Sequence, residues 1–200
     1  MRYGLIIIAL GLALPATALS TTAAAQAAPY GGSAHIAQVG DDNRAGIIQA
    51  TGSRSSQAVI DQSGDDNTAA IDQDGERHTG RIIQNGDRNR AAIDQGGAVN
   101  FATITQDGTG NGAAVVQSAV GSGNYAGVSQ TGSGNQVALT QDGSANSADL
   151  SQTGESNLMR VLQFGDGNAL TWTQIGSNLS APTVQMEGNR TMVVEQIGLR

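Results

Sequence analysis

The sequence contains no cysteine and no lysine, and only 3% of its 200 residues are aromatic. Without cysteine, disulfide frameworks, thiolate metal sites and cysteine nucleophiles are excluded. All ten basic residues are arginine and the formal net charge is −7, so the basic footprint of a nucleic-acid-binding protein is missing. The few aromatic side chains cannot fill a conventional globular core.

Glycine, asparagine and glutamine are abundant instead. The chain has 28 Gly, 13 Asn and 18 Gln, close to a third of all residues. This bias is typical either of disorder or of a β architecture in which the backbone dominates.

Residues 1–27 have the pattern of a secretory signal peptide. Arg2 precedes an apolar run from Leu5 to Leu14, and Ala25-Gln26-Ala27 supplies a small-x-small cleavage site. The run breaks at Pro15, short of the roughly 20 apolar residues that a membrane span needs. We predict a leader in 1–27, a short lead in 28–33 and a repeat region in 34–200, and we expect an exported protein.

An 11-residue repeat, Q-x-G-x-x-N-x-A-x-I-x, dominates the chain after residue 33. Of the fourteen intervals between successive repeat glutamines, twelve are 11 residues and two are 13. The repeat glutamines are Gln38, Gln49, Gln62, Gln73, Gln84, Gln95, Gln106, Gln117, Gln130, Gln141, Gln152, Gln163, Gln174, Gln185 and Gln196. The repeat asparagines, six places before the next glutamine, are Asn43, Asn67, Asn89, Asn100, Asn111, Asn124, Asn135, Asn146, Asn157 and Asn168.

Within each unit, the Asn, Ala, Ile and Gln positions share one parity, so they lie on one face of a strand of about seven residues. The other face is mostly polar. The x-G-x-x segment after each glutamine has turn chemistry, because glycine supplies the positive φ of a corner and Asp, Asn or Ser caps the backbone. Two strands and two corners form a 22-residue coil. The sequence thus predicts an all-β fold, a β-solenoid of about seven such coils with cross-β stacking.

A helix and a set of antiparallel hairpins are the alternatives to the solenoid. An amphipathic helix needs apolar residues at i, i+3, i+4 and i+7, whereas these alternate. Antiparallel hairpins stay possible, because four-residue loops also join hairpins. The recurrence of the same amide favours the solenoid, in which equivalent residues stack about 4.8 Å apart and Gln and Asn ladders satisfy buried donors and acceptors.

A few residues are of types that often form chemical sites. His78 stands in an asparagine position and Trp172 in an inward apolar position, so we expect structural roles for both. The Asp41-Asp42 and Asp65-Asp66 pairs fall in corners, without the glycine-rich nine-residue repeat of calcium-binding β-rolls. No Ser/His/Asp or paired-carboxylate constellation stands out. We therefore expect no catalytic residue, no metal site and no cofactor.

The two halves of the repeat region differ in charge. Residues 41–95 hold ten acidic residues and 96–159 only four. Charges beside β-prone strands slow aggregation, so we hypothesise that the 96–159 coils nucleate assembly and the preceding coils retard it. At the C-terminal end, Leu179 and Arg190 occupy asparagine positions and Thr183 an isoleucine position. This end is therefore either a frayed cap or a docking end for a partner.

No distinct cap precedes the first strand positions, Ala34, Ile36 and Gln38. A repeat stack with unprotected edges is a template for another chain, so end-to-end assembly is the expected behaviour.

The Gln-x-Gly-x-x-Asn-x-Ala unit that returns to Gln resembles the curlin repeat over about residues 34–198. Curlins are the secreted subunits of bacterial curli, pilus-like amyloid fibres on the cell surface. The resemblance implies an extracellular cross-β homopolymer for biofilm matrix and adhesion. It also implies export through an outer-membrane pore, periplasmic chaperones, and a partner that is the nucleator or the major subunit.

Three functional classes follow from the sequence. The first is an amyloid structural subunit, either the major one or a minor nucleator. The second is a monomeric ligand- or ice-binding β-solenoid, and the third is a carbohydrate-active β-helix enzyme. Behaviour of the purified chain separates them: fibres, persistent monomer or glycan turnover.

Overall fold

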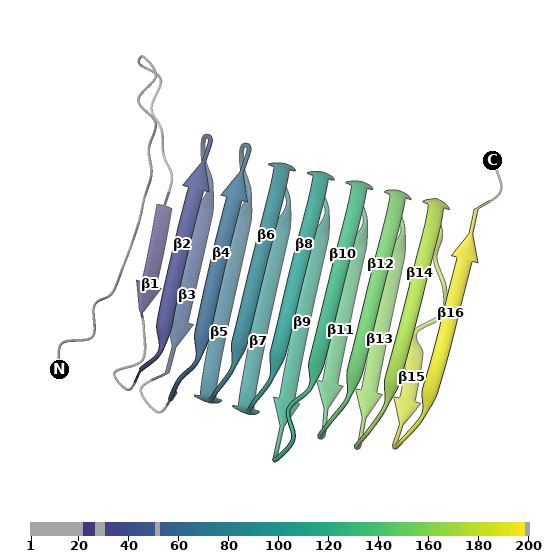
Figure 1. Cartoon of the computed structure of the whole chain (residues 1–200). Helices are drawn as coiled ribbons and strands as arrows, with labels where there is room; N and C mark the ends of the chain where they lie inside the picture. The colour runs from purple at the N-terminus through teal and green to yellow at the C-terminus, as the bar shows by residue number, and fades with distance from the viewer. Residues whose placement is uncertain (1–21, 27–30, 51–52, 199–200) are drawn as a thin grey trace.

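The computed structural model describes residues 22–26, 31–50 and 53–198, and their regular elements are all strands (Figure 1). The strands are β1 Thr22–Gln26, β2 Ser33–Val39, β3 Arg44–Gln49, β4 Gln57–Ser63, β5 Thr68–Glu76, β6 Thr79–Asp87, β7 Arg90–Ala98, β8 Phe101–Thr109, β9 Gly112–Ala119, β10 Tyr125–Ser133, β11 Gln136–Asp142, β12 Ser147–Glu155, β13 Leu158–Phe164, β14 Ala169–Ser177, β15 Val184–Glu187 and β16 Thr191–Ile197.

The strands form two eight-stranded parallel sheets that face each other. The odd sheet has the order β1-β3-β5-β7-β9-β11-β13-β15, and the even sheet runs from β2 to β16 in the same manner. Each strand thus pairs with the strand one coil away and never with its sequence neighbour, which excludes antiparallel hairpins for the described residues. The predicted all-β solenoid is confirmed. It has about eight turns rather than seven, because β1 pairs with β3 and adds a strand in the segment that we assigned to the leader.

A thin apolar seam lies between the sheets. Side chains alternate in and out along each strand, so that Ala58 and Ile60 of β4 are fully buried while Gln57 is exposed. The inward positions are Ala followed by Ile, Val or Leu in nearly every coil. Burying one such Ile, Val or Leu side chain contributes about 1.5–3 kcal/mol, and the small alanines let the sheets approach closely.

Most corners use two left-handed backbone positions, of which the sequence predicted only the first. Gly64 has φ 108°, and a Cβ there would collide with the carbonyl of Gly86 in the next coil. The second position, directly before the asparagine, is filled by non-glycine residues such as Asp66 (φ 58°) and Val99 (φ 62°), and in three corners by Gly110, Gly134 and Gly167. A β-branched residue is strained in this region. The close stacking of the corner backbones, rather than turn chemistry alone, requires the repeated glycine.

The 13-residue interval after Gln117 leaves the stack undisturbed, because its extra residues lie in a corner. Gln117 pairs with Gln95 on one side and with Gln141 on the other although a long corner follows it. In that corner Val120 is 90% exposed. Insertions are therefore absorbed outside the strands, where loop length costs little.

The predicted register is wrong at the last odd strand. Val184, not Thr183, pairs with Val161, and Met186, not Gln185, pairs with Gln163. Pro182 interrupts the strand before β15, since proline cannot donate to the ladder, and one extra residue is accommodated there. Gln185 consequently points outward and donates to Glu187, whereas Met186 is fully buried.

Candidate functional site: stacked amide ladders and open ends

A ladder of glutamine side chains runs through the even sheet. The Nε2 of each glutamine donates to Oε1 of the glutamine one coil further on, from Gln38 to Gln62 at 2.7 Å through to Gln174 and Gln196 at 2.6 Å. The members are Gln38, Gln62, Gln84, Gln106, Gln130, Gln152, Gln174 and Gln196. All except Gln196 are buried.

The odd sheet carries a second glutamine ladder, which ends differently. Its members are Gln49, Gln73, Gln95, Gln117, Gln141 and Gln163, joined at 2.7–3.0 Å. Beyond Gln163 the next partner is the sulfur of Met186 at 3.7 Å. Sulfur is a weak acceptor, so this ladder loses its strong hydrogen bonding before the last coil.

The second amide proton of the ladder glutamines from Gln49 to Gln174 crosses to the opposite sheet. Gln62 of β4 donates to the backbone carbonyl of Arg44 at 3.2 Å, and Gln73 of β5 donates to that of Gln57 at 3.0 Å. One side chain thus joins successive coils and also joins the two sheets. The sequence did not reveal this second role, which depends on where the opposite strand begins.

The repeat asparagines bond mainly to backbone rather than to one another. Asn43 Oδ1 accepts the backbone N–H of Asn67 at 3.0 Å, and Asn43 Nδ2 donates to the carbonyl of Gly64 at 2.6 Å, both in the next coil. Direct contacts between asparagine side chains occur at only three steps in the described coils: Asn89–Asn111, Asn111–Asn135 and Asn146–Asn168. All ten repeat asparagines are buried and close the corners.

His78 replaces an asparagine in this column and reproduces part of its bonding. The backbone N–H of Asn100 donates to Nδ1 at 3.3 Å, so the neutral ring carries its proton on Nε2, which lies 3.2 Å from the carbonyl of Asp74. Burial lowers the pKa of His78, although the carbonyls of Asp74 and Gly97 and the charge of Asp74 act in the opposite direction. The interior therefore holds this ring neutral.

The structure also reveals corner carboxylates with a defined role. Asp65 Oδ1 accepts the backbone N–H of Asp41 at 2.8 Å, and Asp87 Oδ1 accepts that of Asp65 at 3.0 Å. Asp166 and Ser144 repeat the contact near the C-terminal end. These aspartates connect the corners of successive coils by hydrogen bonds. In the sequence, the recurrence of Asp directly after the corner glycine could have predicted this role.

Known protein families were compared with this chain. The curlin associated repeat matches residues 64–97, 75–108, 97–132, 120–143 and 143–176, which together cover more than half of the chain. The chain belongs to the curlin family. No curated protein matches the chain significantly. Curlins are built from a structural repeat, and the family suggests a non-enzymatic protein.

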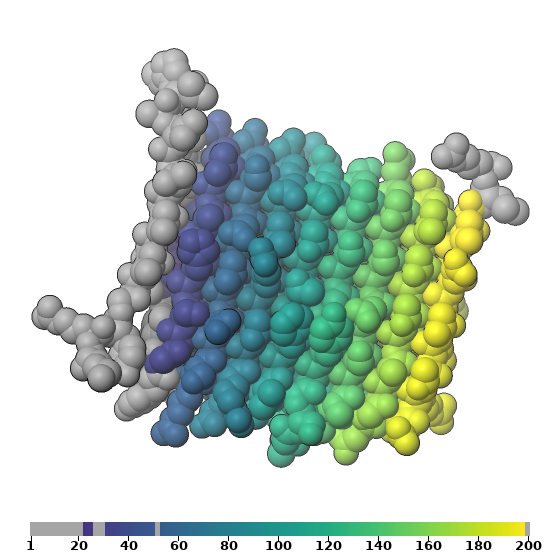
Figure 2. Space-filling model, viewed as in Figure 1, coloured from purple at the N-terminus to yellow at the C-terminus, as the bar shows by residue number. Residues whose placement is uncertain are grey.

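In the described part of this curlin, both sheets end in edge strands. β16 forms the edge of the even sheet at the C-terminal end, and β2 forms its opposite edge (Figures 1 and 2). In the described part of the chain, Gln38 Oε1 receives no hydrogen bond, and Gln196 Nε2 donates none. The even ladder therefore has an unmatched acceptor at one end and an unmatched donor at the other.

The C-terminal coil differs from the others in its interior. Trp172 lies in the inward isoleucine position and is fully buried, as predicted, and its Nε1 has no hydrogen-bond partner within the described chain. Leu179 and Arg190 take asparagine positions; their backbone N–H groups still bond to Asn157 and Asn168, at 3.0 and 3.3 Å, but neither side chain extends the column. The asparagine columns of this curlin end here.

The described residues lack the features of two other kinds of site. Their side chains include no group of three His, Cys, Asp or Glu residues that could hold a metal ion. The same residues contain no helix with the length and apolarity to cross a membrane.

Proposed function

We propose that this curlin is a secreted subunit that stacks end to end into extracellular curli-type amyloid fibres for biofilm matrix and adhesion. The polarity of the even glutamine ladder carries the proposal. When β16 of one copy pairs with β2 of the next, the Gln196 donor of the first faces the Gln38 acceptor of the second. The unpaired backbone groups of both edge strands are satisfied by the same contact.

The family and the leader pattern support the route to the cell surface. A chain with a leader in 1–27 is exported, and curlins are passed through an outer-membrane pore under the control of periplasmic chaperones. We extend these partners to this chain. Its role in the fibre is structural, with no catalytic step.

Replacing the terminal ladder residues tests the proposal. We expect Gln38→Leu and Gln196→Leu each to slow fibre elongation several-fold, because each leaves one buried amide unpaired at the junction, at a cost of about 1–3 kcal/mol. Thioflavin fluorescence and detergent resistance are the measurements. Gln57→Leu is the matched control, since the Gln57 side chain is exposed and outside both ladders.

The unmodified chain provides the decisive outcome. If it stays monomeric, the fibre proposal fails and a ligand- or ice-binding solenoid is favoured. Turnover of a glycan would favour the carbohydrate-active enzyme instead.

A minor nucleator is the second candidate, because the odd ladder ends at Met186 and the two ends are not fully self-complementary. A nucleator shortens the lag of a separate major subunit at substoichiometric amounts, whereas a major subunit is consumed in proportion to fibre mass. Seeding at a 1-to-many ratio distinguishes the two roles.

A further inference from the structure

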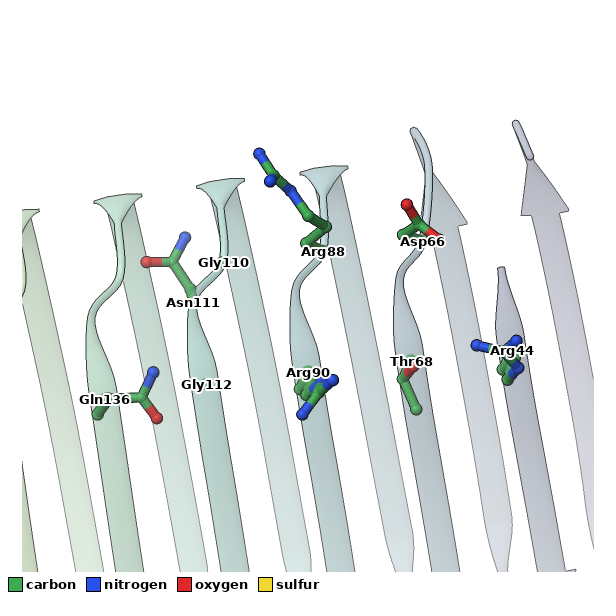
Figure 3. A pocket seen from close by; sticks show the side chains of 9 residues that line it. All are labelled: Arg44, Asp66, Thr68, Arg88, Arg90, Gly110, Asn111, Gly112 and Gln136. Atoms are coloured by element: carbon green, nitrogen blue, oxygen red, sulfur yellow. The ribbon is translucent and has the colours of Figure 1, made fainter. Parts of the chain in front are cut away.

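A hollow of about 470 Å³ opens on the outer face of the odd sheet, beside the corners that precede β5, β7 and β9. Figure 3 shows Asp66 and Arg88 at these corners, and Arg44, Thr68, Arg90 and Gln136 at the beginnings of the strands. Three guanidinium groups thus line one hollow, and Asp66 is its one carboxylate. The hollow is locally positive on a chain whose net charge is −7.

A glycine creates the floor of this hollow. Gly112 of β9 stands between Arg90 and Gln136 in the same column of the sheet. A Cβ on Gly112 would collide with the amide of Gln136, which lies over it. Any side chain at position 112 would displace this amide and fill the space. Because position 112 is glycine, the side-chain amide of Gln136 can lie in the hollow, where its N–H groups are neutral hydrogen-bond donors beside the arginines.

Within the part of the chain that the structure describes, the arginines of the hollow have no carboxylate partner. Among the described residues the ion pairs within 4 Å are Arg54–Glu76 and Arg81–Asp61, and Arg44, Arg88 and Arg90 belong to neither. An exposed arginine fork without a partner is suited to bidentate binding of a carboxylate or another planar anion.

An apolar trough of about 390 Å³ continues the hollow across the sheet. Ala70, Ala92 and Ala114 form its floor, with Asp72 and Asp94 along the far side. Three columns thus run along the stack: Arg44 and Arg90 with Thr68 between them, the alanines, and Asp72 and Asp94 between Ile48 and Val116. A methyl floor fits the apolar C–H face of a sugar ring, whereas the aspartates repel a densely charged phosphate backbone.

We propose that this surface binds an anionic polysaccharide whose sugar carboxylates occupy the arginine hollow. Arg44 and Arg90 are two coils, about 10 Å, apart, so they engage separated carboxylates of one extended chain. The sugar rings between these carboxylates lie on the alanine floor. All of these residues belong to one chain, so binding is independent of fibre growth.

The test uses the full-length chain in its unassembled state and soluble polygalacturonate at low salt. Arg44→Gln/Arg90→Gln is expected to weaken binding at least tenfold, and neutral dextran is expected not to bind. Arg160→Gln is the matched control, because Arg160 is exposed on the outer face of the same sheet, outside the hollow. This control should bind as the unmodified chain does.

If the double variant fails to fold, the Arg90→Lys variant, which keeps the positive charge, provides a second test. It should also weaken binding, since lysine cannot form the bidentate contact. Absent binding, or equal weakening by Arg160→Gln, would overturn the proposal. Single-stranded DNA binding as tightly with the same arginine dependence would also overturn it, in favour of a general polyanion site.

Discussion

At the scale of the residue, one buried glutamine amide per half-coil makes hydrogen bonds to three different parts of the structure. The glutamine side chain accepts a bond from the preceding coil, donates one to the next coil and donates one to the opposite sheet, as Gln62 does. An apolar residue there would leave its neighbours with unsatisfied buried groups, at about 1–3 kcal/mol each. Recurrence of glutamine was sufficient to predict stacking. The bond across the seam was not predictable, because no sequence pattern encodes the distance between the sheets.

His78 predicts an acid-sensitive step in stability. Its folded pKa lies below its unfolded value, so as pH falls below about 6.5 the unfolded state takes up a proton that the folded state resists. Stability is therefore complete above the unfolded pKa and decreases as pH falls toward the folded pKa. A proton on Nδ1 would also oppose the N–H of Asn100. His78→Asn should reduce the difference between urea midpoints at pH 7.5 and pH 5.

His35→Asn is the control for this experiment, because His35 points to the outer face of β2 rather than into the corner column. It should retain the pH dependence of the unmodified chain. The same loss of midpoint on acidification in the His78→Asn variant would contradict the assignment and attribute the effect to carboxyl groups.

At the scale of the element, the two ends of the stack follow different rules from the middle. β1 lies in the segment assigned to the leader, yet it pairs with β3, and Ala23 and Ala25 pack against the seam. With β1 each sheet has eight strands; without it the odd sheet would have seven and the even sheet eight. If removal of the leader also removes β1, the odd sheet lacks one strand at each junction between stacked copies. If β1 is retained, both sheets continue from one copy to the next.

Two versions of the chain, beginning at Thr22 and at Ala28, test the role of β1. We expect slower hydrogen exchange in Arg44–Gln49 for the longer version, because β1 covers the edge of β3. Exchange in β9 should be the same in both unassembled versions. Equal protection of β3 in the two versions would show that β1 does not dock.

At the scale of the whole molecule, charge is distributed unevenly along a uniform stack. Asp72 and Asp94 lie one coil apart in the same column, and partial burial together with the charges of Asp94 and Asp74 raises the pKa of Asp72. Because the pKa of Asp72 is higher in the folded state than its unfolded value of 3.8, the folded state holds the proton more tightly. The stability of the fold therefore decreases as pH rises through 3.8 and then through the folded pKa. Repulsion within these coils is consequently strongest at neutral pH, in line with the hypothesis that they retard assembly.

Neutralising this pair tests that hypothesis. Asp72→Asn/Asp94→Asn should shorten the lag before fibre formation at pH 7 severalfold, because two adjacent like charges are removed. Asp142→Asn/Glu155→Gln removes the same charge from the sparsely charged coils and should change the lag less. A larger effect of the control pair would overturn the assignment of the N-terminal coils as the slow ones.

The sequence by itself determined the repeat, the inward and outward faces and the glycine corners, because a strict 11-residue period leaves one parity for each side chain. It failed where a local exception competed with the period. Pro182 shifts β15 by one residue and places Met186 in a glutamine position, and the predicted positions of Gln185 and Thr183 were wrong for that reason. Only the tertiary structure decided against hairpins, showed that the glutamines from Gln49 to Gln174 also bond across the seam, and brought Arg44 and Arg90 into one hollow. These features depend on distances between coils, which residues far apart in the sequence acquire only when the chain winds.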